Sequence, residues 1–188
     1  KYLIFNDMEV LKTKDLLIGY KDNVILPPIN VSLNSGDLIA LIGPNGAGKS
    51  TLFKTLTANI KPIGGSIKLY NRELSSYTSK EKSTMIGLVL TERPDDMFLK
   101  VYDVVASGRS PYTDFFGRIT DEDNNIIKES LEIVNIIHLK DRYFDALSDG
   151  EKQKVMIAKT IAQKTPIIFM DEPTAFIDYP SKIELFSI

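Results

Sequence analysis

One short segment constrains this chain more than any other. Residues Gly43 to Thr51 read Gly-Pro-Asn-Gly-Ala-Gly-Lys-Ser-Thr and directly follow the apolar run Leu38 to Ile42, where we expect a buried strand to end. Glycines are needed in such a loop because its backbone must curl around phosphate groups with the N–H groups pointing inward. Every fixed position of the phosphate-binding motif is filled. The sequence therefore predicts a nucleoside triphosphate site between a strand and a helix, in preference to a plain glycine turn.

The side chains at the end of this segment have predicted roles. Lys49 would reach the β- and γ-phosphates, Ser50 would offer its hydroxyl to Mg²⁺, and Thr51 would hold the α-phosphate side. The helix that starts here directs the positive end of its dipole at the anion. ATP and Mg²⁺ are therefore the expected ligands. The candidate ATP-binding residues of the loop are Gly43, Pro44, Asn45, Gly46, Ala47, Gly48, Lys49, Ser50 and Thr51.

A second motif lies near the other end of the chain. Ile167 to Glu172 read Ile-Ile-Phe-Met-Asp-Glu, an apolar run typical of a buried strand that ends in two carboxylates. Parallel sheets present ligands at this end of their strands. Asp171 would hold Mg²⁺, directly or through water, and Glu172 would orient and polarise the water that attacks the phosphate. The alternative is a solvated strand end with two surface acids.

A third motif, Leu147 to Lys154, reads Leu-Ser-Asp-Gly-Glu-Lys-Gln-Lys and opens a helical pattern. With this segment the chain resembles the ATPase subunits of ABC transporters, whose signature is Leu-Ser-Gly-Gly-Gln. The resemblance implies that Ser148 and Gly150 contact the γ-phosphate of an ATP held by a second subunit. Ser148 and Glu151 also form a potential capping box, and both interpretations can hold together. The signature positions are Ser148, Asp149, Gly150 and Glu151.

The resemblance extends over essentially the whole chain and implies further site residues. Tyr20 lies at the position of the aromatic A-loop residue that stacks on adenine, although a tyrosine packed at a sheet margin is the alternative. Asp178 stands in the place of the acidic residue of the D-loop, which crosses the dimer interface in the family. Its alternative role is the N-cap of a following helix.

Two positions depart from the family pattern. Thr91 occupies the place of a glutamine that touches Mg²⁺ in the family, so either Thr91 or Glu92 would have to ligate through water. Asp149 replaces the first glycine of the signature. A carboxylate there would be repelled by the γ-phosphate of the partner's ATP, and the helix dipole offsets part of this repulsion.

The middle of the chain resembles one subgroup of the family. Val101 to Ile119 contain Gly-Arg-Ser-Pro and then Phe-Gly-Arg, which is similar to the ATPases of importers for iron siderophores, haem and cobalamin. In the family this helical subdomain docks onto a membrane permease. The alternative is that the phenylalanines are core and the arginines a solvated rim. The candidate partner surface is Arg109, Tyr112, Phe115, Phe116 and Arg118.

These motifs predict an α/β fold, a P-loop NTPase with a mainly parallel core sheet, an antiparallel β subdomain and an inserted α-helical subdomain. With 188 residues, 43% of them hydrophobic, the chain can bury the core of a single domain. We therefore expect one ABC ATPase domain over 1–188, with the helical subdomain at 92–150. Because the chain begins with Lys1 and stops at Ile188, before the strand that carries the family's switch histidine, we also expect a C-terminally truncated fragment. The one histidine, His138, is assigned a structural role.

Composition excludes several other classes. The formal net charge is −2 and no basic run tracks a phosphate backbone, so nucleic acid is not an expected partner. The chain has no cysteine, which excludes disulfides and thiolate metal sites. No apolar stretch approaches the length of a membrane span. The resemblance implies an ATPase that powers an importer at the cytoplasmic face of the cell membrane, as a head-to-tail homodimer on a permease. The alternatives are a non-transport ABC ATPase, for example in DNA repair, and a regulatory module without turnover.

Overall fold

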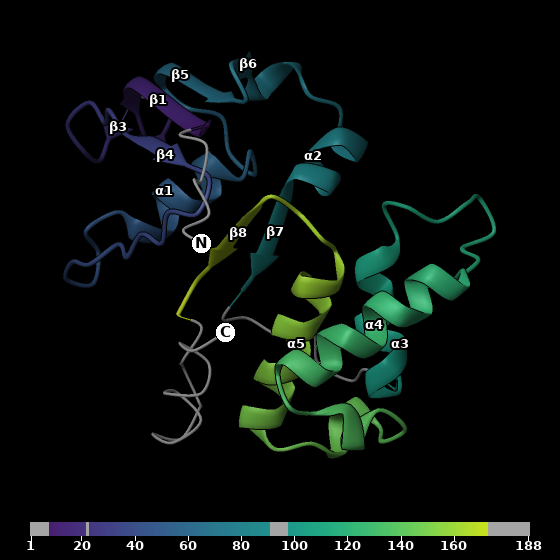
Figure 1. The fold of residues 1–188 in the computed structure, drawn as a ribbon. Helices are drawn as coiled ribbons and strands as arrows, with labels where there is room; N and C mark the ends of the chain where they lie inside the picture. The colour runs from purple at the N-terminus through teal and green to yellow at the C-terminus, as the bar shows by residue number, and fades with distance from the viewer. Residues whose placement is uncertain (1–7, 22, 91–97, 173–188) are drawn as a thin grey trace, which may run out of the picture. The chain divides into compact units, whose positions relative to one another are not determined.

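The computed structural model of the chain describes residues 8–21, 23–90 and 98–172. They fall into two compact units, Lys1–Ser79 and Lys80–Ile188 (Figure 1). The first unit is built on an antiparallel sheet, and the second combines a parallel pair of strands with a group of helices.

The sheet of the first unit has the order β4-β1-β5-β6. Its long central strand β1 alternates buried and exposed side chains over Leu11, Lys12, Thr13 and Lys14, which is the period of a strand with one buried face. Leu11 lies opposite Leu69 of β5, and both are almost fully buried. The strands are β1 Glu9–Leu17, β4 Ser32–Asn34, β5 Gly64–Leu69 and β6 Arg72–Glu73.

The rest of the first unit is a small hairpin and one helix. The hairpin pairs β2 (Gly19–Tyr20) with β3 (Asn23–Val24), and the helix α1 spans Lys49–Leu56. A short 3-10 turn, η1 (Leu74–Ser76), follows the sheet.

The predicted buried strand at Leu38 to Ile42 is wrong for the described structure. These residues form no strand, and the exposed fractions of Leu38 and Ile42 are 93% and 90%. A strand requires a neighbour that satisfies its backbone hydrogen bonds. No described strand of the first unit pairs with this segment, so its apolar composition alone was not enough to make it a buried strand.

In the second unit, β7 (Ile86–Val89) and β8 (Ile167–Met170) form a parallel pair, in register from Ile86 opposite Ile167. The helices are α3 (Val101–Ala106), α4 (Asp121–Ile133) and α5 (Asp149–Ala162). α2 (Ser79–Met85) leads into β7. The short turns η2 (Ser107–Arg109), η3 (Ile137–Leu139) and η4 (Phe144–Ala146) connect the helices.

The core of the second unit lies where α3, α4 and α5 meet. Val104, Ile127 and Val155 contribute one fully buried side chain from each helix. Gly108 lets η2 pack closely against α5, because a Cβ on Gly108 would lie 2.2 Å from the Lys159 carbonyl oxygen. His138 lies on η3, after α4 has ended, and its side chain is exposed.

Candidate nucleotide site

The phosphate loop has the backbone that its glycines permit. Gly46 and Gly48 have φ values of 80° and 90°, in the left-handed region that favours glycine. A Cβ on Gly48 would also lie 2.9 Å from Ile25 Cγ2, whereas a Cβ on Gly46 would meet no atom within 4 Å. Gly43 has no such φ, so the conformational argument holds for two of the three predicted glycines.

Lys49 closes over the loop from the first turn of α1. Its Nζ donates to the carbonyl oxygens of Gly43 at 2.7 Å and Pro44 at 2.9 Å. The first turn of α1 contains no acidic residue, so the positive end of the helix dipole is not offset there. The Lys49 ammonium, the N-terminus of α1 and the open space at Gly46 together suit the binding of a phosphate group.

The two hydroxyl residues after Lys49 differ in exposure. Ser50 is exposed, whereas Thr51 is only 8% exposed and its carbonyl accepts from the hydroxyl of Thr55 at 2.8 Å. Ser50 can therefore reach a ligand from this structure as it stands. The role of Thr51 on the α-phosphate side stays a prediction.

Tyr20 lies on the β2–β3 hairpin of the same unit. Its side chain is 52% exposed, and Ile25, which follows the hairpin, donates its N–H to the Ile18 carbonyl at 2.9 Å. Ile25 is also the residue that a Cβ on Gly48 would meet. The residue that follows the hairpin thus lies close to the phosphate loop within the first unit, and a ligand can reach the half-exposed Tyr20 ring.

The carboxylate pair ends β8 as predicted, and the backbone turns there. The Asp171 N–H donates to the Val89 carbonyl at 2.9 Å, which continues the parallel ladder by one residue. Glu172 is exposed and has a φ of 47°, an uncommon conformation for a residue with a Cβ. Such backbone outliers gather at functional sites. The strand itself is less buried than predicted, because Ile168 is 39% exposed.

The signature residues open α5 through the predicted capping box, which is confirmed. Ser148 Oγ and N donate to Glu151 Oε2 at 2.8 Å each, and the Glu151 N–H donates back to Ser148 Oγ at 3.4 Å. The Ser148 backbone and hydroxyl hold the pKa of the Glu151 carboxyl below its ordinary value, with smaller contributions from Arg142 and His138. Because a hydroxyl has one hydrogen to donate, Ser148 must turn away from Glu151 before it can donate to a phosphate.

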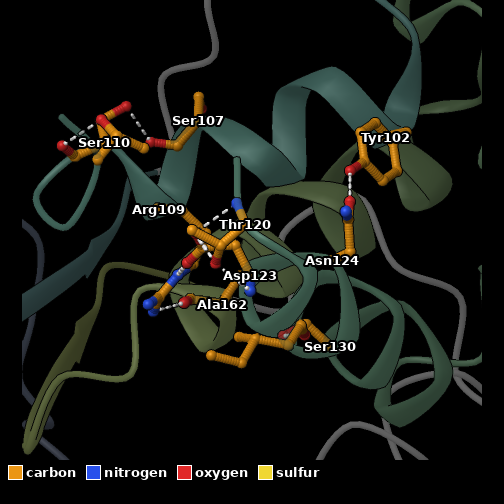
Figure 2. A network of polar contacts seen from close by, with 11 residues as sticks. Tyr102, Ser107, Arg109, Ser110, Thr120, Asp123, Asn124, Ser130 and Ala162 are labelled. Carbon is orange, nitrogen blue, oxygen red and sulfur yellow. Dashed lines mark hydrogen bonds and ion pairs between the residues drawn. The ribbon is translucent and has the colours of Figure 1, made fainter. Parts of the chain in front are cut away.

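Arg109 does not belong to an exposed partner surface, which corrects the prediction. Its Nε donates to Asp123 Oδ1 at 2.7 Å and its Nη1 to the Ala162 carbonyl at 2.9 Å, and the residue is 7% exposed (Figure 2). The guanidinium carbon also lies 4.1 Å from the ring centroid of Tyr112. Sequence reasoning missed Asp123. The available indication was its place three residues after Thr120, in a capping box that the structure contains.

The predicted site residues divide between the two units. Lys49 and Ser50 lie in the first, and Asp171 and Glu172 in the second. Thr91, Glu92 and Asp178 lie outside the described residues.

A metal site made by the chain alone is not found in the described part of the structure, because no group of three or more His, Cys, Asp or Glu residues could hold an ion there. The predicted donors to Mg²⁺ are one hydroxyl, from Ser50, and one carboxylate, from Asp171. Such hard oxygen donors fit Mg²⁺, which usually takes one or two protein ligands and keeps the rest of its shell as water and phosphate oxygens. Among the residues described, no helix is long and apolar enough to cross a bilayer.

Comparison with known proteins gives matches over nearly the whole chain. The family model described as ABC transporter matches residues 26–175. An uncharacterized ABC transporter ATP-binding protein of Methanocaldococcus jannaschii is 44% identical over 94% of this chain and 61% of its own length. The iron(3+)-hydroxamate import ATP-binding protein FhuC of Bacillus subtilis is 35% identical over 96% of this chain and 67% of its own length.

Solved structures share the fold. A structure described as an inward-facing metal-chelate type ABC transporter matches with a TM-score of 0.81 and 30% identity, over 96% of this chain and 66% of that one. The agreement confirms the predicted α/β fold of a P-loop NTPase. The chain spans 61% to 67% of the length of the two relatives.

Proposed function

The chain belongs to the ABC transporter family, and from this premise we propose that it is the ATP-binding and ATP-hydrolysing part of an importer for an iron siderophore, haem or cobalamin. The observation that carries the proposal is the phosphate loop, where left-handed Gly46 and Gly48 precede Lys49 at the start of α1. The iron(3+)-hydroxamate import ATP-binding protein among the relatives supports this subgroup. We also propose that the chain forms one ABC ATPase domain over 1–188, with a helical subdomain at 92–150.

Binding of ATP begins in the phosphate loop. The Lys49 ammonium exchanges its bonds to the carbonyls of Gly43 and Pro44 for bonds to phosphate oxygens, and the N-terminus of α1 supplies further donors. Tyr20 stacks its exposed ring on adenine. When bound, Mg²⁺ would neutralise charge on the β- and γ-phosphates, with Ser50 and Asp171 as its protein ligands.

Hydrolysis requires a group that positions water. Glu172 is an exposed carboxylate and can accept a hydrogen bond from a water molecule that attacks in line. Its left-handed backbone supports this role, because such uncommon conformations gather at functional sites.

The proposed partners are a second copy of the chain and a permease. In a head-to-tail dimer, Ser148 and Gly150 of one copy close over the ATP of the other, and Asp178 lies at the interface. Closure and hydrolysis shift the population between open and closed dimers, which drives the permease between two states. The protein would thus work at the cytoplasmic face of the membrane through its permease.

A second candidate function is favoured by a specific observation. Asp149 and Glu151 place two carboxylates at the signature, and Glu151 holds the Ser148 hydroxyl. This arrangement weakens closure over a triphosphate and would suit a regulatory nucleotide-binding module. The acidic pair at the end of β8, in contrast, favours turnover.

The test uses the complete protein with Glu172→Gln, purified from detergent-solubilised membranes, with its partners identified by mass spectrometry. We expect a polytopic permease to copurify, and its bound ligand would name the cargo. DNA-repair factors, ribosomal proteins or no partner at all would contradict the importer function. Steady-state phosphate release by the unsubstituted complete protein separates an ATPase from a regulatory module.

A further inference from the structure

The hydroxyl of Ser148 already has an acceptor in this structure, and that acceptor is charged. Ser148 Oγ donates to Glu151 Oε2 at 2.8 Å, and the Ser148 N–H donates to the same oxygen at 2.8 Å. These bonds hold the pKa of the Glu151 carboxyl below its ordinary value, so the carboxyl is ionised near neutral pH and can only accept. A hydrogen bond to an ionised acceptor is roughly twice as strong as one between neutral groups.

The backbone on both sides of Ser148 is fixed, so only its side chain can turn. Leu147 is 6% exposed and donates its N–H to the carbonyl of Phe144, which is almost fully buried. On the other side, the Lys152 N–H donates to the Ser148 carbonyl at 2.9 Å, in the first turn of α5. Rotation about the Cα–Cβ bond of Ser148 would break the bonds that its Oγ makes with Glu151 and leave the bond from its N–H in place. The start of α5 therefore keeps one of its cap bonds while the hydroxyl changes acceptor.

The second capping box of the same unit has the same bonds in a closed environment. At the start of α4, the Thr120 hydroxyl donates to Asp123 Oδ2 at 2.7 Å. Asp123 is 5% exposed and also accepts from Arg109, so this carboxylate is held inside the core (Figure 2). Ser148, in contrast, is exposed, and a ligand can reach its hydroxyl. The two boxes share a hydrogen-bond pattern and differ in access.

We propose that Glu151 is a positioning residue that acts as a latch on Ser148. It holds the serine hydroxyl while no γ-phosphate is present, releases it to the γ-phosphate of the partner's ATP, and takes it back after hydrolysis. This proposal rests on the proposed function, in which Ser148 closes over that ATP. The hydroxyl has one hydrogen, so the carboxylate and the phosphate compete for it. Because the bond to Glu151 must be given up in each copy, the latch opposes closure and favours reopening once the phosphate has left.

The latch differs from charge repulsion at the signature. Repulsion between Glu151 and a phosphate would act whether or not residue 148 carries a hydroxyl. The latch requires that hydroxyl and an acceptor stronger than a neutral amide. Removing the hydroxyl and the carboxylate singly and together separates the two effects, because the non-additive part of the double substitution reports the interaction between the two side chains.

The test measures the dissociation constant of the ATP-bound dimer by sedimentation velocity, with the complete protein in a Glu172→Gln background. Glu151→Gln should tighten the dimer about fivefold or more, because an amide oxygen is the weaker acceptor for the serine hydroxyl. The gain should disappear in a Ser148→Ala background, measured at protein concentrations high enough to populate that dimer. Glutamine also closes a capping box, so the urea midpoint of Glu151→Gln should stay close to that of the unsubstituted protein.

Glu151→Asp is the conservative control. It keeps a carboxylate, and Asp123 shows that a side chain of this length can close the same box with its N-cap residue. The dimer of Glu151→Asp should therefore be as weak as that of the parent protein. Tightening by Glu151→Asp equal to that by Glu151→Gln would contradict the latch, because the charged acceptor is still present.

The remaining outcomes separate the latch from the proposed function. Equal dimerisation of Glu151→Gln and the parent protein would overturn the latch while the importer function stands. A gain of the same size in the Ser148→Ala background would assign the effect to charge repulsion and would also overturn the latch. Absence of any ATP-dependent dimer in the Glu172→Gln protein itself would overturn the head-to-tail closure of the proposed function, and the latch with it.

Discussion

Arg109 donates its Nε hydrogen to Asp123 Oδ1 at 2.7 Å, and the side chains of both residues are less than a tenth exposed. The same guanidinium donates to the carbonyl of Ala162, at the C-terminal end of α5. One buried cation thus joins η2, the start of α4 and the end of α5. Because α5 begins at the signature and leads into β8, this ion pair helps to fix the helix that connects two of the predicted site segments.

We expect Arg109→Ala to lower the free energy of unfolding by about 3–5 kcal/mol, because it leaves Asp123 charged and buried without its partner. Urea unfolding of the purified chain measures this. The matched control is Arg118→Ala, whose exposed pair with Asp114 at 3.9 Å should contribute at most about 1 kcal/mol. Similar losses for the two variants would contradict a structural role for the buried pair.

The same pair predicts a loss of stability in acid. The Thr120 backbone N–H, then the Arg109 guanidinium and the Thr120 hydroxyl, hold the pKa of Asp123 below its ordinary value. A depressed pKa in the folded state gives stability that is fully present above the unfolded pKa and is lost as the pH falls through the folded one. The stability of the unsubstituted chain should therefore fall more steeply below about pH 4 than that of Asp123→Asn, as followed by urea titrations at each pH. Parallel curves would contradict this assignment.

Gln153 predicts a stabilising substitution. It is 1% exposed, and neither its Nε2 nor its Oε1 has a hydrogen-bond partner in the described structure. Because a buried polar group without a partner costs about 1–3 kcal/mol, Gln153→Met should raise the free energy of unfolding by a similar amount. Gln163→Met is the control and should be destabilising, since the Gln163 amide donates to the carbonyls of Ser83 and Ile86. A loss of stability in Gln153→Met would show that the amide has a partner in solution.

We expect the charge of Asp149, in the signature, to oppose closure of the dimer. Asp149→Asn removes a carboxylate near the expected γ-phosphate of the partner's ATP, so ATP-dependent dimerisation should tighten. Sedimentation velocity of the complete protein, in a Glu172→Gln background, measures the dimer fraction. Asp141→Asn removes an exposed carboxylate elsewhere on the same unit and should have no effect. If Asp149→Asn leaves the dimer fraction unchanged, repulsion at this position is not significant.

Glu172→Gln should bind ATP yet release phosphate at least about a hundredfold more slowly than the unsubstituted complete protein, because an amide cannot take a proton from water. Nucleotide binding by fluorescence and phosphate release over a single turnover separate the two effects. Glu122→Gln, at an exposed carboxylate on α4, is the control. Brisk release by Glu172→Gln would move the water-positioning role to another residue.

Much of the local structure could be predicted from the sequence. Ser148 with Glu151 placed the start of α5. Gly48 precedes the first residue of α1 and the carboxylates follow β8, as expected, although the strand expected before the phosphate loop does not form. In each case the deciding chemistry is contained within a few consecutive residues.

Longer-range features could not be predicted in the same way. Arg109, assigned to an exposed surface, is buried because Asp123 and the Ala162 carbonyl both reach it. The run Leu38 to Ile42 has the composition of a buried strand but no pairing partner among the described strands of its unit.

The sequence by itself determined the chemistry of this protein: a phosphate loop, a carboxylate pair at a strand end, and a capped signature helix. These depend on backbone conformations and caps that neighbouring residues set, so spacing along the chain is sufficient to find them. Only the tertiary structure decided which side chains are buried, which are paired and which are exposed. Burial and pairing depend on segments that are distant in sequence, and so Arg109 became a core cation while Phe115 stayed exposed.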